Sequence, residues 1–289
     1  MTTDQAAPDA TGPGRPAPTV TLADGTTIPA ITLGTWLMDD DAAAEAVADA
    51  VADGYRQVDT AMRYHNEEGV GRGLRECGLP RDQVAVTSKL RGGDHGYDAT
   101  MRAFKATKRN LGLGPVDLYL IHWPLPGQDL YVETWRALID LRDAGEIRSI
   151  GVSNFTPAHI QRLIDETGEA PVVNQVELHP GWRQEELREY CAERGIVVQA
   201  WGPLSRGKGL LERPEVASAA EAAGVAPAKV VLRWLGQWGI PSVPKSADPD
   251  RRRANIDIFD FELDEAQMRA LSSMPQERYG KDPDVHEEY

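Results

Sequence analysis

Four polar side chains with complementary acid–base chemistry follow successive apolar runs of the sequence. Asp59 closes one such run, Lys89 the next and His122 the one after. Tyr64 lies five residues beyond Asp59. A phenol with an ordinary pKa of about 10 donates its proton poorly near neutral pH, but a neighbouring ammonium lowers that pKa by stabilising the phenolate, and a carboxylate can hold the ammonium in place. If the four residues converge, they predict general acid catalysis by tyrosine.

Each of the four residues has an ordinary structural role when it is taken alone. An aspartate at the end of a strand is more often a helix cap than a catalyst, and a lysine is usually a solvated surface charge. A lone histidine or tyrosine is often a satisfied polar residue at the rim of a fold. The catalytic interpretation therefore depends on a fold that brings the ends of several strands together.

The elements that must position these residues are short β-branched runs that alternate with amphipathic stretches. This rhythm is typical of repeated βα units around a parallel sheet. Strands are predicted at residues 31–34, 57–59, 84–88, 116–121, 149–152, 172–175, 197–200 and 240–243. Helices are predicted, among others, at residues 41–52, 99–111, 132–144, 156–166 and 184–194. We therefore predict an α/β protein with the (β/α)8 TIM-barrel fold, in which the C-terminal strand ends form one ring.

The predicted domain organisation is a short tail followed by one barrel. Residues 1–18 are rich in Ala, Pro, Gly, Thr and Asp and lack the basic start and apolar core of a signal peptide, so we expect a disordered tail and a cytoplasmic location. Residues 19–289 are expected to form a single domain. It opens with a hairpin at residues 19–28, whose turn signal is Asp24-Gly25, and we expect this hairpin to close the floor of the barrel.

Composition and charge exclude several classes of partner. The sequence is 41% hydrophobic and 26% charged, as in globular proteins, and its net charge of −14 repels nucleic acid and anionic membrane surfaces. No apolar run approaches the roughly 18 residues of a membrane span. Cys77 and Cys191 have no CxxC spacing, so neither a disulfide framework nor a thiolate metal site is expected. We expect a cytoplasmic monomer without a nucleic-acid partner, a membrane partner or a metal.

Several segments of the sequence resemble the aldo-keto reductase family. Residues 54–61 and 64–67 resemble its first signature, and residues 118–124 resemble its second. Shorter segments that match in the order of the family are residues 87–90, 151–155, 174–180, 201–204 and 244–246. The resemblance extends from residue 19 to about residue 275, and the rim of the predicted barrel is most similar to bacterial 2,5-diketo-gluconate reductases.

The resemblance implies a role for each of the four polar residues. Tyr64 would donate the proton, Lys89 and Asp59 would adjust the pKa of Tyr64, and His122 would orient the substrate carbonyl. All four residues are present. Hydride would pass from NADPH to the carbonyl carbon while Tyr64 protonates the oxygen. The expected reaction converts a small aldehyde, ketone or keto-sugar acid into an alcohol.

The cofactor site is expected away from any glycine-rich Rossmann loop. No GxGxxG motif follows a predicted strand, and Gly69, Gly71 and Gly73 lie in a helix-like stretch. Barrels often bind phosphate near the loops after strands seven and eight. Here those loops, residues 203–209 and 244–246, carry cations that oppose the global negative charge. We therefore expect NADP(H) to bind there.

The resemblance also implies which residues hold the cofactor. Lys245, Ser246 and Arg251 would bind the 2′-phosphate of NADPH, for which a planar guanidinium is suited. The basic residues 251–253 would equally suit a solvated helix start. The full expected set is Thr35, Asp59, Ser153, Asn154, Gln175, Trp201, Gly202, Pro203, Leu204, Ser205, Gly209, Lys245, Ser246, Arg251 and Asn255.

The reacting end of the cofactor and the substrate are expected to share one pocket. By the same resemblance, Trp201 would stack on the nicotinamide ring. The carboxamide of that ring would be bound by Ser153, Asn154 and Gln175. Trp36, Met38 and Trp123 fall at strand ends, so they are candidates to line a substrate pocket together with Tyr64 and His122, although aromatic residues at such positions are as often core as pocket.

Two other functions are compatible with parts of the sequence. Asp59, His65, His122, Glu177 and His179 could surround a metal ion in a barrel hydrolase. The first predicted strand supplies no ligand pair, which disfavours that interpretation. A noncatalytic NADPH-binding sensor on the same barrel is the other alternative, and the intact set of four polar residues favours an enzyme over a sensor.

Overall fold

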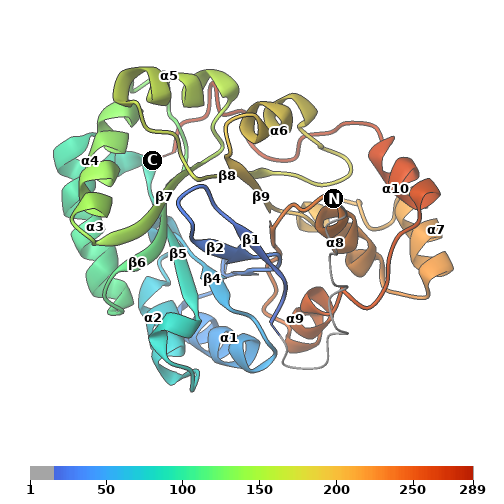
Figure 1. The fold of residues 1–289 in the computed structure, drawn as a ribbon. Helices are drawn as coiled ribbons and strands as arrows, with labels where there is room; N and C mark the ends of the chain where they lie inside the picture. Colours follow the sequence, from blue (N-terminus) through green and yellow to red (C-terminus); the bar gives the residue numbers. More distant parts are fainter. Residues whose placement is uncertain (1–15, 289) are drawn as a thin grey trace, which may run out of the picture.

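The computed structural model describes residues 16–288, and its centre is a sheet of eight parallel strands (Figure 1). The strands lie in chain order, from β3 to β10. Parallel bridges join Ile31 to Ser242 and Gly34 to Lys245, so the first and last strands close the sheet into a barrel. The strands are β3 (Leu33–Gly34), β4 (Gln57–Asp59), β5 (Ala85–Leu90), β6 (Val116–Ile121), β7 (Ile147–Ser153), β8 (Val173–Glu177), β9 (Val197–Trp201) and β10 (Ser242–Val243). The predicted (β/α)8 fold is confirmed.

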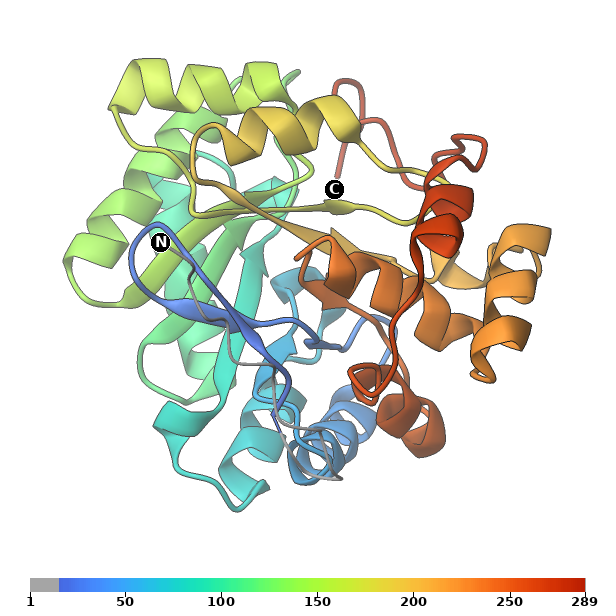
Figure 2. The same cartoon turned by 45° about the vertical axis from the view of Figure 1, so that its right-hand side comes forward.

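The helices surround the strands (Figure 2). Several begin at the capping residues that sequence rules favour: the side chain of Asp39 accepts a hydrogen bond from Ala42 N, and Thr156 and Asp264 form capping boxes. The helices are α1 (Asp40–Ala52), α2 (Glu67–Glu76), α3 (Tyr97–Leu111), α4 (Tyr131–Asp143), α5 (Pro157–Thr167), α6 (Glu185–Ala192), α7 (Pro214–Ala223), α8 (Pro227–Gln237), α9 (Pro249–Ile256) and α10 (Glu265–Ser272).

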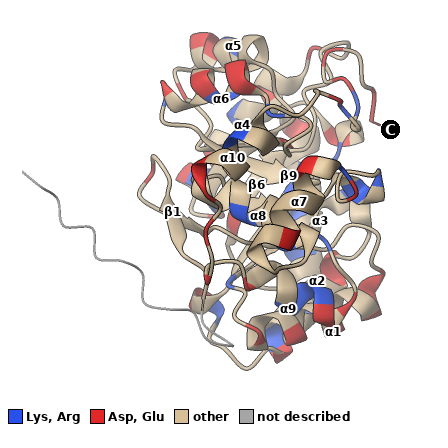
Figure 3. Ribbon diagram, turned by 90° about the vertical axis from the view of Figure 1, so that its right-hand side faces the viewer, with Lys and Arg blue, Asp and Glu red and all other residues tan. Residues whose placement is uncertain are grey.

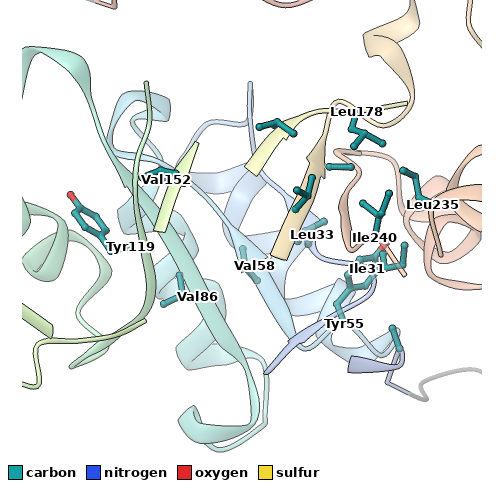
Figure 4. Packing of buried hydrophobic residues seen from close by; sticks show 14 of the residues in the cluster. Ile31, Leu33, Tyr55, Val58, Val86, Tyr119, Val152, Leu178, Leu235 and Ile240 are labelled. Carbon is teal, nitrogen blue, oxygen red and sulfur yellow. The ribbon is translucent and has the colours of Figure 1, made fainter. Parts of the chain in front are cut away.

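Strand β6 shows how the side-chain alternation of a strand divides the core into two layers. Tyr119 packs against Phe104 of α3 with ring centroids 5.2 Å apart, in the layer between strands and helices (Figure 4). Leu118 and Leu120 instead join a separate cluster with Leu22. Because successive side chains of a strand point to opposite faces, residues of one parity face the helices and those of the other face the barrel interior.

An N-terminal hairpin covers the floor of the barrel, as predicted. Strands β1 (Thr19–Thr21) and β2 (Thr27–Pro29) pair antiparallel around a turn in which Gly25 has a φ of +82°. Leu22 and Ile28 of this hairpin pack with the inward-facing leucines of β6. The hydroxyl of Ser149 donates a hydrogen bond of 2.7 Å to Asp24 Oδ2, which fixes the turn against β7.

The predicted tail falls mainly on residues 1–15, which lie outside the described residues. The residues just before the hairpin are packed: Ala17 is buried in the main core, and the carbonyl of Pro18 accepts a hydrogen bond of 2.7 Å from Ala30 N. Strand bounds also differ from the expected ones at the seam of the barrel. Residues 31 and 32, expected in a strand, precede β3 and pair only through an isolated bridge.

The three glycines of α2 are packing residues of a helix. A Cβ atom at Gly69 would overlap the backbone carbonyl of Asp40 in α1, and one at Gly71 would overlap that of Leu111 in α3. Glycine is therefore required where α2 approaches both neighbouring helices closely. Their helical setting agrees with the prediction that they form no phosphate-binding loop.

Acidic and basic side chains are distributed over the outer helices (Figure 3). Among the described residues, no helix is long and apolar enough to cross a membrane.

Candidate active site

The inner face of the barrel determines where the acid–base residues point. Gln57 and Thr87 face the interior, where Gln57 Nε2 donates a hydrogen bond of 2.9 Å to Thr87 Oγ1. Asp59 and Lys89 lie two residues further along the same strands, so their side chains also face the interior, at its C-terminal end. The period of two in β4 and β5 thus brings these charges together.

Asp59 and Lys89 form a buried ion pair. Lys89 Nζ lies 2.5 Å from Asp59 Oδ1, and the side chains are only 1% and 5% exposed, respectively. The other oxygen of the carboxylate accepts a hydrogen bond of 2.7 Å from Gln175 Nε2, and Lys89 Nζ also donates to the carbonyl of Thr60. Burial alone would lower the pKa of Lys89, but Asp59 and Tyr64 together outweigh it through their charges and hydrogen bonds, and the pKa is raised. The ammonium therefore stays charged.

Tyr64 ends the short helix η1 (Met62–Tyr64) and lies beside this pair. Lys89 Nζ is 5.3 Å from the centroid of its ring. Burial raises the pKa of Tyr64, while Lys89 lowers it and Asp59 raises it further, and the net direction is upward. Lys89 thus acts in the expected sense, but the expected net lowering is wrong for this environment because burial outweighs the ammonium. The phenol is protonated at neutral pH and can serve as a donor.

His122 completes the group at the end of β6. Its ring meets that of Tyr64 edge to face, with centroids 5.9 Å apart. Asn154 Nδ2 donates a hydrogen bond of 2.9 Å to the His122 carbonyl, which fixes the backbone at this strand end. The structure thus brings all four predicted acid–base residues to one end of the barrel.

The residues expected at the nicotinamide carboxamide form a hydrogen-bonded network next to this group. Ser153 Oγ donates to the carbonyl of Gln175 at 2.7 Å, and Asn154 Nδ2 lies 3.0 Å from Ser153 Oγ. Asn154 adopts a left-handed φ of 64°, in which its Oδ1 accepts a hydrogen bond of 2.8 Å from Trp201 Nε1. The network links Ser153, Asn154 and the indole of Trp201 to the backbone of Gln175.

Trp201, expected to stack on the nicotinamide, contacts Arg206, one of the cations of the loop at residues 203–209. The Arg206 guanidinium lies 4.6 Å from the Trp201 ring and 4.1 Å from that of Trp36, a predicted pocket residue. Arg206 and the preceding Ser205 both have positive φ, 53° and 52°. These non-glycine residues hold a costly backbone conformation at the mouth of the barrel.

The loop after β9 has features that suit a phosphate group. Gly202 and Gly209 have φ values of +58° and +81°, so a loop backbone can approach a ligand closely there. The hydroxyl of Ser205 is buried without a hydrogen-bond partner among the described residues. Pro203 is buried and Leu204 packs on the core, which anchors the loop. A buried unpaired hydroxyl in a glycine-rich loop fits the predicted cofactor.

Three consecutive arginines in α9 have three different environments. Arg252 is 2% exposed and lies 2.8 Å from Asp49 in α1, so it holds α9 on the barrel. Arg253 pairs with Asp250 on the surface. Arg251 is exposed. Arg251 is therefore accessible to solvent, and its predicted contact with a phosphate stays a prediction.

The other residues expected at the adenosine end lie on the same side of the barrel. Lys245 follows β10 and is exposed, whereas Ser246 and Asn255 are buried. Ser246 Oγ accepts a hydrogen bond of 3.1 Å from Asp248 N, at the start of α9. Lys245 and Arg251 therefore flank the N-terminus of a helix, which itself favours anions.

Two predicted ligand-lining residues have mainly structural contacts. Thr35 is fully buried and its hydroxyl donates a hydrogen bond of 3.0 Å to the Asp59 carbonyl. Met38 is 4% exposed and belongs to the main hydrophobic core, so its proposed place in a substrate pocket is not supported. Trp123 lies at the mouth, 4.4 Å from the ring of His286.

The C-terminal segment crosses the barrel mouth and was missed by the sequence analysis. Glu177 accepts hydrogen bonds of 2.8 Å from Tyr279 N and 2.6 Å from Gly280 N. Burial would raise the pKa of Glu177, but the hydrogen bonds from His179 and these amides outweigh it and lower the pKa. Further on, Glu288 Oε1 lies 2.9 Å from His122 Nδ1. No local pattern marks these contacts, because the partners are far apart in sequence.

The side chains considered for a metal site are engaged elsewhere. Asp59 is held by Lys89, and Glu177 by His179 and the C-terminal backbone. His65 is exposed at the end of η1. Within residues 16–288, no group of three or more His, Cys, Asp and Glu side chains could hold a metal ion.

Comparison with known sequences gives one family. A model described as the aldo/keto reductase family matches residues 30–275. The 2,5-diketo-D-gluconic acid reductase B of Corynebacterium sp. is 45% identical, covering 94% of this chain and 98% of that protein. The glyoxal reductase of Bacillus subtilis is 44% identical, covering 92% of this chain and 96% of that protein.

Solved structures agree with this result. A mutant of Gox0644 in complex with NADPH superimposes with a TM-score of 0.90 at 43% identity, covering 94% of this chain and 99% of that one. The Bombyx mori aldo-keto reductase in complex with NADP gives a TM-score of 0.86 at 35% identity, covering 93% and 96% of the two chains.

Proposed function

Because this chain belongs to the aldo/keto reductase family, we propose that Tyr64 is the proton donor of its reaction. The chain is an NADP-dependent oxidoreductase that reduces carbonyl groups. The observation that carries the proposed role of Tyr64 is the buried ion pair of Asp59 and Lys89, whose ammonium lies 5.3 Å from the phenol ring. That pair stabilises the phenolate that proton donation leaves behind.

The chain's own residues carry out the proton transfer. NADPH supplies the hydride when it is bound. Tyr64 gives the proton of its hydroxyl to the carbonyl oxygen, and Lys89 stabilises the resulting phenolate while Asp59 holds Lys89 in place. His122 donates a hydrogen bond that orients the carbonyl oxygen toward Tyr64. Burial keeps the phenol protonated before the reaction, since it raises the pKa of Tyr64.

We further propose how the chain holds its cofactor. Ser153, Asn154 and Gln175 bind the nicotinamide carboxamide beside Trp201, and the loop around Ser205 approaches the phosphates. Lys245 and Arg251, with Ser246, bind the 2′-phosphate, which favours NADPH over NADH. The unpaired hydroxyl of Ser205 and the exposure of Arg251 support this assignment.

The substrate in this proposal is a small aldehyde, ketone or keto-sugar acid. The named relatives support this range, because one is a diketo-gluconic acid reductase and another is a glyoxal reductase. We also propose that the enzyme works as a cytoplasmic monomer without a nucleic-acid or membrane partner, which its net charge of −14 supports.

A carbonyl panel tests the proposal. Aldehydes, diketones, keto acids and sugars are each mixed with the purified protein and NADPH, and the loss of NADPH absorbance is followed. Turnover of some of these carbonyls, unchanged by a metal chelator, is the expected result. Tight NADPH binding without reduction of any carbonyl would replace the enzyme by the noncatalytic sensor, and a chelator-sensitive hydrolysis would favour the metal enzyme.

A further inference from the structure

The carboxylate of Glu288 lies inside the active site, although the residue belongs to the last segment of the chain. Its Oε1 is 2.9 Å from His122 Nδ1, and its Oε2 accepts a hydrogen bond of 2.8 Å from Gly92 N. Arg63 Nε is 3.5 Å from Oε1. The side chain is only 4% exposed. A backbone amide, an imidazole and a guanidinium thus surround one carboxylate, and we call these three groups the anion cradle.

Contacts along the C-terminal segment hold the carboxylate of Glu288 in the anion cradle. Glu177 holds the backbone at Gly280, where a Cβ would lie 2.5 Å from Glu177 Oε2. Nearer the end, His286 packs edge to face on Trp123 with ring centroids 4.4 Å apart. Because the segment is anchored both at β8 and beside His122, the position of Glu288 follows from the packing of the segment.

Glu288 carries a negative charge at neutral pH. Burial would raise its pKa, but His122, the Gly92 amide and Arg63 outweigh burial and lower it. Two further histidines among residues 16–288, His95 and His286, interact with this carboxylate. Burial lowers the pKa of His286, and lowers that of His95 to about 4, so both are neutral at pH 7 and neither cancels the carboxylate.

The three groups of the anion cradle would otherwise attract a negatively charged substrate. They lie beside His122, the residue proposed to orient the carbonyl, so a carboxylate a few bonds from the reacting carbonyl could reach them. With Glu288 in place, that carboxylate meets a filled cradle and a like charge in a poorly solvated site. Two like charges side by side in such a site repel each other, which strongly lowers the affinity for a substrate that carries a carboxylate.

We propose that Glu288 is a specificity-determining residue that selects uncharged carbonyl substrates over carboxylates by filling the anion cradle with the chain's own carboxylate. This inference rests on the proposed function, because it assigns a substrate class to the same site. Within the proposed substrate range, it favours uncharged aldehydes and ketones over keto-sugar acids. The names of the relatives leave this choice open, since they include both a diketo-gluconic acid and glyoxal.

Matched substrates test the proposal. 4-Carboxybenzaldehyde and its methyl ester present the same aldehyde with and without a charge, and kcat/KM is measured for both at pH 7. The native enzyme is expected to favour the ester. Glu288→Gln keeps the shape of the side chain and removes its charge, so the carboxylate-to-ester ratio of kcat/KM should rise at least about tenfold.

The neighbouring Glu287 offers a matched control, because it is exposed. Glu287→Gln removes one charge from the same segment and should leave the ratio unchanged. Glu288→Lys should raise the ratio further than Glu288→Gln. Quenching of tryptophan fluorescence by NADPH, with the same Kd in all variants, checks that the variants are folded.

The outcomes distinguish this inference from the proposed function. A native enzyme that reduces the carboxylate as well as the ester overturns the inference alone, as does a ratio that Glu288→Gln leaves unchanged. An equal shift in Glu287→Gln also overturns it, because the effect would then come from net charge. A protein that reduces no carbonyl of the wider panel refutes the proposed function, and this inference with it.

Discussion

Two regions supply the active site in different ways. Asp59 and Lys89 come from β4 and β5, whose pairing register fixes their separation, and both are almost fully buried. Arg206 and Glu288 reach the same mouth from the loop after β9 and from the C-terminal segment, and Arg206 holds a left-handed φ of 53°. The strand ends hold the ion pair that is proposed to assist proton transfer, whereas the loop after β9 and the C-terminal segment hold charged groups that face the mouth. This division suits a barrel fold, in which the loops vary from one protein to another while the strand scaffold is kept.

The largest expected effect lies at Tyr64, which the strand-held pair of Asp59 and Lys89 is proposed to assist. Tyr64→Phe removes one oxygen and leaves the ring to pack, so kcat should fall at least about 100-fold, at the lower end of the 10²–10⁴ that general acid catalysis contributes. The Kd of NADPH should change little, because Tyr64 is not among the residues proposed to hold the cofactor. Steady-state kinetics and fluorescence titration measure the two quantities.

Tyr119→Phe is the matched control, because that tyrosine packs on α3 outside the barrel. It should keep near-normal kcat. If Tyr64→Phe also does so on every carbonyl that the native enzyme reduces, the tyrosine mechanism is wrong. Lys89→Met should act through the same phenol, so the loss in the double variant should be much smaller than the product of the two single losses.

The next effect concerns how the free energy of unfolding depends on pH through His95, which lies near the strand end of β5. His95 is buried beside the loop that holds Gly92, and burial lowers its pKa to about 4, against 6.5 for an ordinary histidine. Between these values the unfolded chain binds a proton that the folded chain does not. The free energy of unfolding should therefore fall as pH falls from 6.5 to 4.

The size of that loss is about 3 kcal/mol, since each pKa unit is worth roughly 1.4 kcal/mol. His95→Leu removes the titration, so its free energy of unfolding should vary less over the same range. Urea denaturation at several pH values measures the difference. Parallel pH profiles for the native and variant proteins would show that His95 is not held neutral in the fold.

The smallest expected effect lies at the rim. Arg251→Gln should weaken NADPH binding by about 1.5–3 kcal/mol, the usual contribution of a hydrogen bond to a charged group. NADH, which lacks the 2′-phosphate, should bind almost as before. Arg253→Gln is the matched control, because Arg253 is also exposed but pairs with Asp250. Equal weakening of both cofactors by Arg251→Gln would contradict the assignment.

The sequence predicted the strand-held region well because strands impose a simple rule on it. Asp59, Lys89 and His122 each close an apolar run, and a parallel barrel must gather such positions at one end. The direction of the pKa shift of Tyr64 could not be predicted, because it depends on how deeply the phenol is buried. Burial is a property of the packed fold that no spacing records.

The loop-held region was predicted less well. Glu288 contacts Gly92 across 196 positions of the chain, and no periodicity or motif links two residues at that distance. Arg206 was expected among the loop cations, but its place between two indoles was not predicted, because it depends on positive φ at residues that are not glycine. Glycine, asparagine and aspartate are the residues usually found in that conformation, so the sequence does not indicate it at a serine and an arginine.

The N-terminal hairpin closes one end of the barrel. Leu22 and Ile28 pack against the inward leucines of β6, so a substrate must arrive and its product must depart at the opposite end. The C-terminal segment crosses that end, where Glu177 holds its backbone. A contact that slows entry there also slows exit by the same path, as microscopic reversibility requires. Tightening or loosening the segment therefore changes how fast the carbonyl and alcohol equilibrate and leaves their equilibrium ratio unchanged.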